Sequence, residues 1–265
     1  MGIMPTIAVT SMKGGVGKTT VTLGLASAAW KRGLRVLVID LDPQANATMG
    51  LASPTPRFTI NDVLADARPG IAAEAVLETG WGSNVHVIAS DRALEHRNVA
   101  EGKYSSLRLR ASLATLPRQY DLVLIDCPPS LGELTRNALS AANKAVIVTE
   151  PGYFSLHGAA QAVEAVEVIR GATNPTLSTA TILVNRARTT VADHRMRIQE
   201  LREAYGPLVS DIMVPERNAI PQSEGAGIPI HAWDSPAGRE LSGIFDTLYD
   251  QLTQPPGRIL KESLS

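Results

Sequence analysis

The stretch that decides the fold of this chain is Lys13-Gly14-Gly15-Val16-Gly17-Lys18-Thr19-Thr20. An apolar run at 7–9 precedes it and a helix-like segment at 21–30 follows it, which is the strand–loop–helix order of a phosphate-binding loop. The glycines lack Cβ atoms, so backbone N–H groups and the start of the helix can approach anionic oxygens closely. The whole stretch is therefore predicted to bind nucleotide, with Lys18 on the terminal phosphates and the Thr19 hydroxyl on Mg²⁺.

Composition limits the classes of protein to which the chain can belong. Its 265 residues are 44% hydrophobic and 19% charged, which supplies a sizeable core and excludes wholesale disorder. The net charge is −1, so any contact with DNA or lipid must use a local patch. With Cys127 as the single cysteine, a disulfide framework within the chain is excluded. No signal-peptide pattern and no apolar stretch of about 18 residues is visible, so we expect a cytoplasmic protein without stable membrane insertion.

Acidic residues follow two of the apolar segments. The run at 34–39 ends in Asp40-Leu41-Asp42, and the run at 122–125 ends in Asp126. Ligand sites of open α/β sheets lie at the carboxyl ends of the strands, so these carboxylates are expected beside the phosphate loop. Asp126 then matches the carboxylate that holds Mg²⁺, usually through water, in phosphate-loop enzymes.

Strand-like and helix-like segments alternate along the chain without an internal repeat. This order predicts one doubly wound α/β fold with a mostly parallel sheet and helices on both faces. We expect an ATPase domain over 1–253 and a polar tail over 254–265. Expected strands are 6–10, 34–39, 85–88, 122–125, 144–149, 179–184 and 208–214, and expected helices are 20–31, 71–78, two pieces within 91–118, 133–142, 155–170, 191–205 and 235–252.

The chain resembles the ParA-type partition ATPases of the group with a deviant phosphate loop. The resemblance runs over almost the whole chain, so it covers the fold as well as the loop. Its motifs are Lys13-Gly-Gly-Val-Gly-Lys18-Thr-Thr, Asp40-Leu-Asp42-Pro-Gln44-Ala-Asn46-Ala-Thr48, Asp126-Cys-Pro-Pro-Ser130, Val184-Asn185-Arg186 and Pro215-Glu-Arg217-Asn218.

The resemblance implies a role for residues outside the phosphate loop. Asp42 matches the catalytic carboxylate that orients the attacking water, and Lys18 acts with it on the phosphates. Asp40 lies two residues earlier and is expected to help with Mg²⁺ or water, beside Thr19 and Asp126 as metal residues. Asn185 and the backbone near Pro215 match positions that hold adenine.

Lys13 matches the signature lysine, which in this family reaches across a dimer interface to the partner's nucleotide. The position agrees with this role, because a lysine five residues before Lys18 cannot easily reach its own nucleotide. Inserted from a facing subunit, it would neutralise phosphate charge as an arginine finger does. ATP would then join two copies into a homodimer, and hydrolysis would separate them.

The resemblance further implies non-specific double-stranded DNA binding in the ATP state and a nucleoid-associated location. Arg186, Arg188 and Arg217 are the expected contacts, although the segment 185–217 also carries five acidic residues that oppose them. A centromere-binding or cargo-adaptor partner is expected to stimulate hydrolysis, and the cargo stays open among a chromosome, a plasmid and a protein cluster.

Three other classes of protein share the same loop. A MinD-like membrane-cycling ATPase would need a C-terminal amphipathic helix, and the end of this chain is too short and polar. A small-molecule ligase or kinase would need a further substrate site, for which no constellation is visible. Iron–sulfur relatives need several cysteines, so they are excluded. The loop begins Thr-Ser-Met-Lys13 and Glu216 separates Pro215 from Arg217, and these departures leave the subgroup open.

Overall fold

The computed structural model describes residues 5–66, 68–117 and 120–253. The expected tail at 254–265 lies outside them. The strands are β1 (Thr6–Thr10), β2 (Val36–Asp40), β3 (Val76–Thr79), β4 (Gly82–Ile88), β5 (Leu122–Asp126), β6 (Lys144–Thr149), β7 (Ser178–Ala187) and β8 (Val209–Pro215). The helices are α1 (Lys18–Lys31), α2 (Asn46–Gly50), α3 (Ile60–Asp66), α4 (Ile71–Ala75), α5 (Arg108–Leu113), α6 (Glu133–Ala141), α7 (Ser155–Ala172), α8 (Ala192–Tyr205), α9 (Ala219–Ala226) and α10 (Pro236–Thr253), with 3₁₀ turns η1 (Arg92–Asn98), η2 (Ser105–Leu107), η3 (Gly206–Leu208) and η4 (Ile230–Ala232).

The described strands form one sheet in the order β3-β4-β2-β5-β1-β6-β7-β8. Every neighbouring pair is parallel except β3 and β4, so the prediction of a mostly parallel sheet is confirmed. The central strands β1, β2 and β5 are buried along their whole length, which explains the apolar run that each one contains. β1 lies between β5 and β6, so the loop that follows it emerges at the middle of the sheet.

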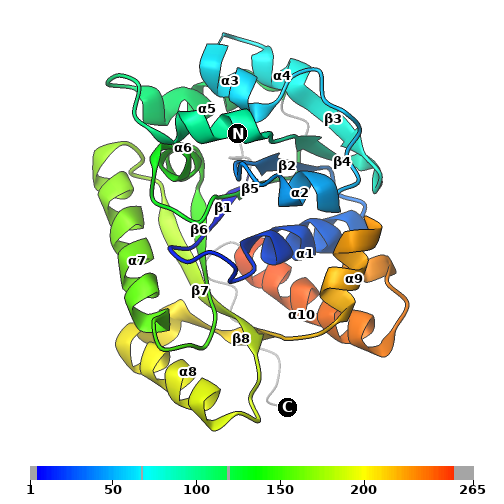
Figure 1. Ribbon diagram of the computed structural model, residues 1–265, viewed down its shortest axis with the longest axis vertical. Helices are drawn as coiled ribbons and strands as arrows, with labels where there is room; N and C mark the ends of the chain where they lie inside the picture. Colours follow the sequence, from blue (N-terminus) through cyan, green and yellow to red (C-terminus); the bar gives the residue numbers. More distant parts are fainter. Residues whose placement is uncertain (1–4, 67, 118–119, 254–265) are drawn as a thin grey trace, which may run out of the picture.

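Helices cover both faces of the sheet (Figure 1). One core lies between the sheet and α1 and α10, and includes Leu25, Val38 and Phe245. A second core on the other face packs α3 to α6 on strands β2 and β5, and a third packs α7 and α8 on the β7 side. No helix within the described ranges is long and apolar enough to cross a bilayer.

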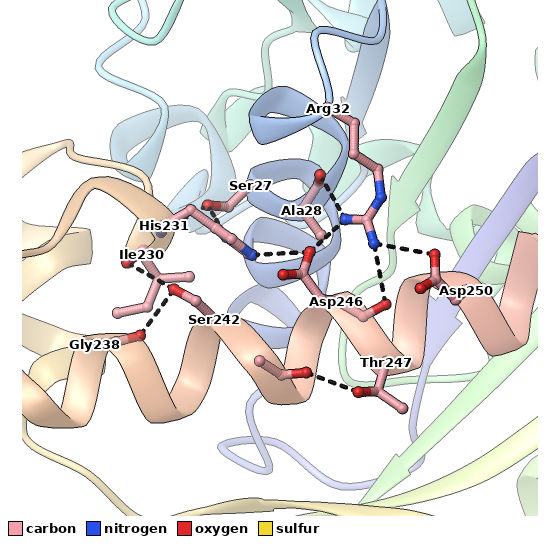
Figure 2. A network of polar contacts seen from close by, with 11 residues as sticks. Ser27, Ala28, Arg32, Ile230, His231, Gly238, Ser242, Asp246, Thr247 and Asp250 are labelled. Carbon is pink, nitrogen blue, oxygen red and sulfur yellow. Dashed lines mark hydrogen bonds and ion pairs between the residues drawn. The ribbon is translucent and has the colours of Figure 1, made fainter.

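Helix α10 is fastened to α1 by a network of polar side chains (Figure 2). The Arg32 guanidinium pairs with Asp246 and lies 3.0 Å from Asp250 Oδ1. His231 Nδ1 lies 2.7 Å from Ser27 Oγ, and its Nε2 lies 3.4 Å from Asp246 Oδ1. Burial lowers the pKa of His231, although the Asp246 carboxylate opposes the change. Because α1 begins at the phosphate loop, this network fixes the helix that carries the loop.

Three expected elements differ in the structure. The helix expected over 71–78 ends at Ala75, and β3 follows it as the antiparallel edge strand. The segment 91–118 contains η1, η2 and the short α5 rather than two longer helices. The segment 215–229, for which the sequence predicted neither a helix nor a strand, contains α9. The pairing of β3 with β4 and the packing of α9 on the α1 side are long-range contacts, which local patterns do not report.

Close packing of α1 on α10 makes a specific stability prediction. A Cβ at Gly24 would lie 2.3 Å from the Phe245 ring, whereas a Cβ at Gly243 would meet nothing within 4 Å. Gly24→Ala is expected to destabilise the protein by about 2 kcal/mol through overpacking. Gly243→Ala is the matched control and should stabilise by up to about 1 kcal/mol through helix propensity. Urea denaturation followed by circular dichroism measures both, and an unchanged midpoint for Gly24→Ala would contradict the packing.

Candidate active site

The loop between β1 and α1 has the backbone of an anion cradle. Gly15 and Gly17 have φ angles of +79° and +91°, in the left-handed region that favours glycine. Gly17 is the N-cap of α1 and provides no side-chain hydrogen bond to the helix start, so the first N–H groups stay available to a ligand. The predicted phosphate loop therefore has both the conformation and the open helix terminus that anions need.

Lys18 lies in the wall of this cradle. It is only 6% exposed, yet its ammonium has no hydrogen-bond or ion-pair partner among the residues that the structure describes. A largely buried lysine whose ammonium has no contacting carboxylate favours an anionic ligand that would complete it. The surroundings of Lys18 therefore fit a bound phosphate group.

Asp126 and Thr19 come together at the start of α1, as the sequence predicts. The Thr19 hydroxyl donates to Asp126 Oδ2 at 2.7 Å, and the Thr22 hydroxyl donates to Asp126 Oδ1 at 3.0 Å. Burial raises the pKa of Asp126 to about 8, and the neighbouring Asp40 carboxylate adds to the rise. A cation beside this carboxylate would favour its ionised form, so the pair suits Mg²⁺.

Asp40 holds the loop that follows β2. Its Oδ1 accepts from the Asp42 N–H at 3.1 Å, and its Oδ2 accepts from both the N–H and the hydroxyl of Thr48 at 2.8 Å. Burial raises the pKa of Asp40 to about 6. Asp40 and Asp126 are partners in register on β2 and β5. The sequence did not predict that Asp40 holds the loop after β2 in place. The role of Asp40 toward Mg²⁺ stays a prediction.

Asp42 begins the turn at the same edge of the sheet. Its Oδ1 accepts from the Gln44 N–H at 2.9 Å, so one oxygen fixes the turn.

Within the described part of the chain, no group of three or more His, Cys, Asp or Glu side chains could hold a metal ion alone. Mg²⁺ commonly takes one or two protein ligands together with substrate phosphates, so a donor set as small as Thr19 and Asp126 is compatible with a Mg²⁺ site.

The side chain of Asn185, on β7, holds the backbone of the phosphate loop in place. Its Nδ2 donates to the Val16 carbonyl at 2.7 Å, and a Cβ at Gly17 would lie 2.0 Å from the same nitrogen. Asn185 is buried, and its Oδ1 has no hydrogen-bond partner in the described structure. Pro215 ends β8 beside β7, at the same edge. No local pattern indicates the supporting role of Asn185, and its contact with adenine stays a prediction.

Lys13 is engaged by an acidic residue of its own chain. Its Nζ forms an ion pair with Glu150, which follows β6, and the lysine side chain is 53% exposed. Sequence reasoning missed Glu150, although an acidic residue directly after an apolar strand was the signal that identified Asp126.

Thr20, also expected at the nucleotide, lies in the first turn of α1, and its hydroxyl donates to Glu224 Oε1 on α9 at 2.8 Å.

The arginines expected to contact DNA differ in their surroundings. Arg188 pairs with Glu216, and Arg217 makes two 2.8 Å hydrogen bonds to Glu240. Arg186 is exposed, has a φ of +53° and has no ion-pair or hydrogen-bonded side-chain partner in the described ranges. Two of the three expected cations are therefore neutralised within the chain.

Comparison with known proteins finds a matching family model and similar proteins that cover most of the chain. A family model described as "AAA domain" matches residues 4–179. The chromosome partitioning protein ParA of Caulobacter vibrioides is 33% identical over 239 residues, covering 86% of each chain. The sporulation initiation inhibitor protein Soj of Bacillus subtilis is 32% identical over 234 residues, covering 86% of this chain and 90% of Soj.

Solved structures show the same fold. The apo structure of McdA from Cyanothece has a TM-score of 0.83 at 24% identity and covers 94% of this chain and 100% of McdA. A cobyrinic acid a,c-diamide synthase from Mycobacterium smegmatis, solved with bound ADP and magnesium, has a TM-score of 0.77 at 25% identity and covers 94% of this chain and 95% of its own.

Proposed function

This chain belongs to the ParA/Soj-type partition proteins, and from this premise we propose that it hydrolyses ATP and works as a dimerising switch. The observation that carries the proposal is Lys18, which is largely buried and has no hydrogen-bond or ion-pair partner within the described residues, in an open anion cradle beside two acidic strand ends. A cradle without carboxylates would support binding alone. The carboxylates of Asp42 and Asp126 supply the groups that hydrolysis needs.

ATP and Mg²⁺ are the nucleotide and the metal ion. The N–H groups of the loop and the Lys18 ammonium bind phosphate oxygens, and Thr19 with Asp126 are the residues that would hold the metal. Mg²⁺, when bound, supplies positive charge that screens the phosphates from the nearby carboxylates. Asp42 has one oxygen engaged with Gln44, and its other oxygen, which has no hydrogen bond among the described residues, would orient a water molecule for attack on the terminal phosphorus.

The switch between one copy and two depends on Lys13. Its partner Glu150 is on the same chain, and the pair lies at the surface. An exposed ion pair of this kind is weak, so Lys13 can exchange Glu150 for the phosphates of a second copy at small cost. Two copies facing one another would then each complete the other's nucleotide site, and hydrolysis would remove the phosphate that holds them.

Cargo positioning would follow if the ATP-bound dimer binds DNA on the nucleoid. Arg186 is the strongest DNA candidate, because Arg188 and Arg217 are each paired with a glutamate. A dimer doubles any such contact, and phosphate contacts add up in affinity. A centromere-binding or cargo-adaptor protein is proposed to stimulate hydrolysis and release the dimer from DNA.

The ATPase proposal predicts a separation between binding and turnover. Lys18→Ala should weaken ATP binding at least about 100-fold, because it removes a buried charge-assisted contact. Asp42→Ala should bind ATP as the wild type does, while turnover falls about 100-fold through loss of water orientation. Calorimetry and phosphate release measure the two effects. Phosphate release must occur without a second substrate, since a ligase would require one. Unchanged ATP affinity in Lys18→Ala would contradict the assignment.

The dimer proposal predicts opposite effects of two neighbouring substitutions. In an Asp42→Ala background with ATP, Lys13→Ala should stay monomeric while its ATP affinity is kept. Glu150→Gln should dimerise at a protein concentration several-fold lower, because the competing carboxylate charge is gone. Sedimentation velocity gives both results. ATP-dependent dimers of the Lys13→Ala variant would refute the role of this lysine between two copies.

The DNA proposal predicts that binding requires ATP and weakens steeply with salt. Arg186→Ala should lower affinity and reduce the salt slope by about 1 for each phosphate that this arginine neutralises. Glu216→Gln should raise affinity by releasing Arg188. Glu74→Gln is the charge-matched control, because Glu74 pairs with Arg68 beside α4, far from β8 in the sheet (Figure 1). Fluorescence anisotropy with a duplex measures each variant, and equal binding with and without ATP would argue against the switch.

A further inference from the structure

Two loops leave the sheet beside the phosphate site and start from adjacent positions. We name residues 41–45 the Asp42 loop and residues 127–132 the Asp126 loop. Their strands pair in register, and the Leu41 N–H donates to the Asp126 carbonyl at 2.9 Å. A third segment, residues 90–98, contacts the chain next to both loops. Thr48 makes the contact near the Asp42 loop, and Asn98 makes the contact with the Asp126 loop.

Thr48 makes the connection on the side of the Asp42 loop. Its hydroxyl donates to Asp40 Oδ2 at 2.8 Å and accepts from the Ser90 N–H at 3.0 Å. Asp40 in turn accepts from the Asp42 N–H. One hydroxyl therefore connects the carboxylate that orders the Asp42 loop to the chain that leaves β4.

The segment from Ser90 to Asn98 is well anchored between its two ends. Asp91 is the N-cap of η1, since its Oδ1 accepts from the Ala93 N–H at 2.7 Å, and its Oδ2 accepts from the Thr59 hydroxyl at 2.6 Å. Leu94 is fully buried in the core that also contains residues of α3 and α5. Because the turn is capped and its buried anchor is closely packed, we expect a displacement at one end to be passed to the other.

Asn98 makes the connection on the side of the Asp126 loop. Its Nδ2 donates to Ser130 Oγ at 3.4 Å, and its Oδ1 is buried without a hydrogen-bond partner in the described structure. A Cβ at Gly132 would lie 2.0 Å from this Oδ1. Asn98 therefore packs against Gly132, the last residue before α6, and is in contact with the Asp126 loop.

We propose that Thr48 and Asn98 are positioning residues that connect the two loops through the segment 90–98, so that the position of Asp42 follows the position of the Asp126 loop. The link deepens the proposed ATPase function and rests on it for its effect on turnover. The link consists of hydrogen bonds and close contacts. It runs from Asp42 through Asp40 and Thr48 to Ser90, and along the segment to Asn98 and Gly132. Neither Thr48 nor Asn98 needs to touch the nucleotide for this role.

Hydrogen exchange tests the link without relying on ATP hydrolysis. Thr48→Val keeps the side-chain shape and removes the hydroxyl, so peptides that cover residues 127–136 should exchange several-fold faster although the substitution is in another part of the chain. Thr48→Ser keeps the hydroxyl and should restore the exchange of the wild type. Unchanged exchange at 127–136 in Thr48→Val would overturn the proposal, whatever the ATPase activity is.

A double-mutant cycle tests the effect on turnover. Thr48→Val and Asn98→Ala should each lower kcat by about tenfold with ATP affinity within twofold, because geometry rather than binding is lost. The double variant should be close to the lower single variant, since breaking the path at either end uncouples both. A fall equal to the product of the two single effects would overturn the link. Absence of ATP turnover in the wild type would instead contradict the proposed function.

Gly132 offers an independent variant with a matched control. Gly132→Ala should lower kcat because its Cβ displaces Asn98, and the same change in an Asn98→Ala background should have little further effect. Gly171→Ala is the control, since a Cβ there would meet nothing within 4 Å. Equal effects of Gly132→Ala in both backgrounds would show that Asn98 is not the group displaced, and would overturn the proposed connection.

Discussion

Burial of two neighbouring carboxylates in the middle of the sheet is the constraint on which the site depends. Asp40 and Asp126 are both fully buried and lie opposite one another on β2 and β5. Each would be unstable as an isolated buried charge. Burial raises the pKa of both carboxyl groups, and the charge of Asp40 raises the pKa of Asp126 further. The surrounding loops and helices are arranged so that donors reach these oxygens.

The donors come from separate parts of the chain, which ties distant elements to the site. Thr19 and Thr22 reach Asp126 from α1, and Thr48 reaches Asp40 from α2. The same geometry keeps Lys18 nearby, and its charge opposes the rise in the pKa of Asp126. Helix α1 must then be held firmly, and the network of Arg32, His231 and Asp246 with α10 does this (Figure 2).

Sequence reasoning predicted the parts of the molecule that local patterns determine. The apolar runs at β1, β2 and β5 marked central parallel strands, and their acidic ends marked the edge where the loop lies. The β3 strand was missed because Val76 and Leu77 continue a helix-like pattern, and only pairing with β4 makes them a strand. Asn185 as a support of Val16, and Glu150 as the partner of Lys13, depend on residues more than a hundred positions apart. Such pairs are set by topology, so a single sequence does not report them.

The two lysines of the loop differ in the cost of changing partner, and this difference orders the events of the proposed switch. Lys18 is largely buried and makes no hydrogen bond or contact ion pair among the described residues, so phosphate binding would give its charge a contacting partner within the single chain. Lys13 is exposed and already paired with Glu150, so it gains little from nucleotide in its own chain. Nucleotide binding is therefore favoured before association, and association must offer Lys13 more charge than Glu150 does. In the proposed switch the terminal phosphate of ATP would provide that additional charge and ADP would lack it, so the contact between two copies would be sensitive to hydrolysis.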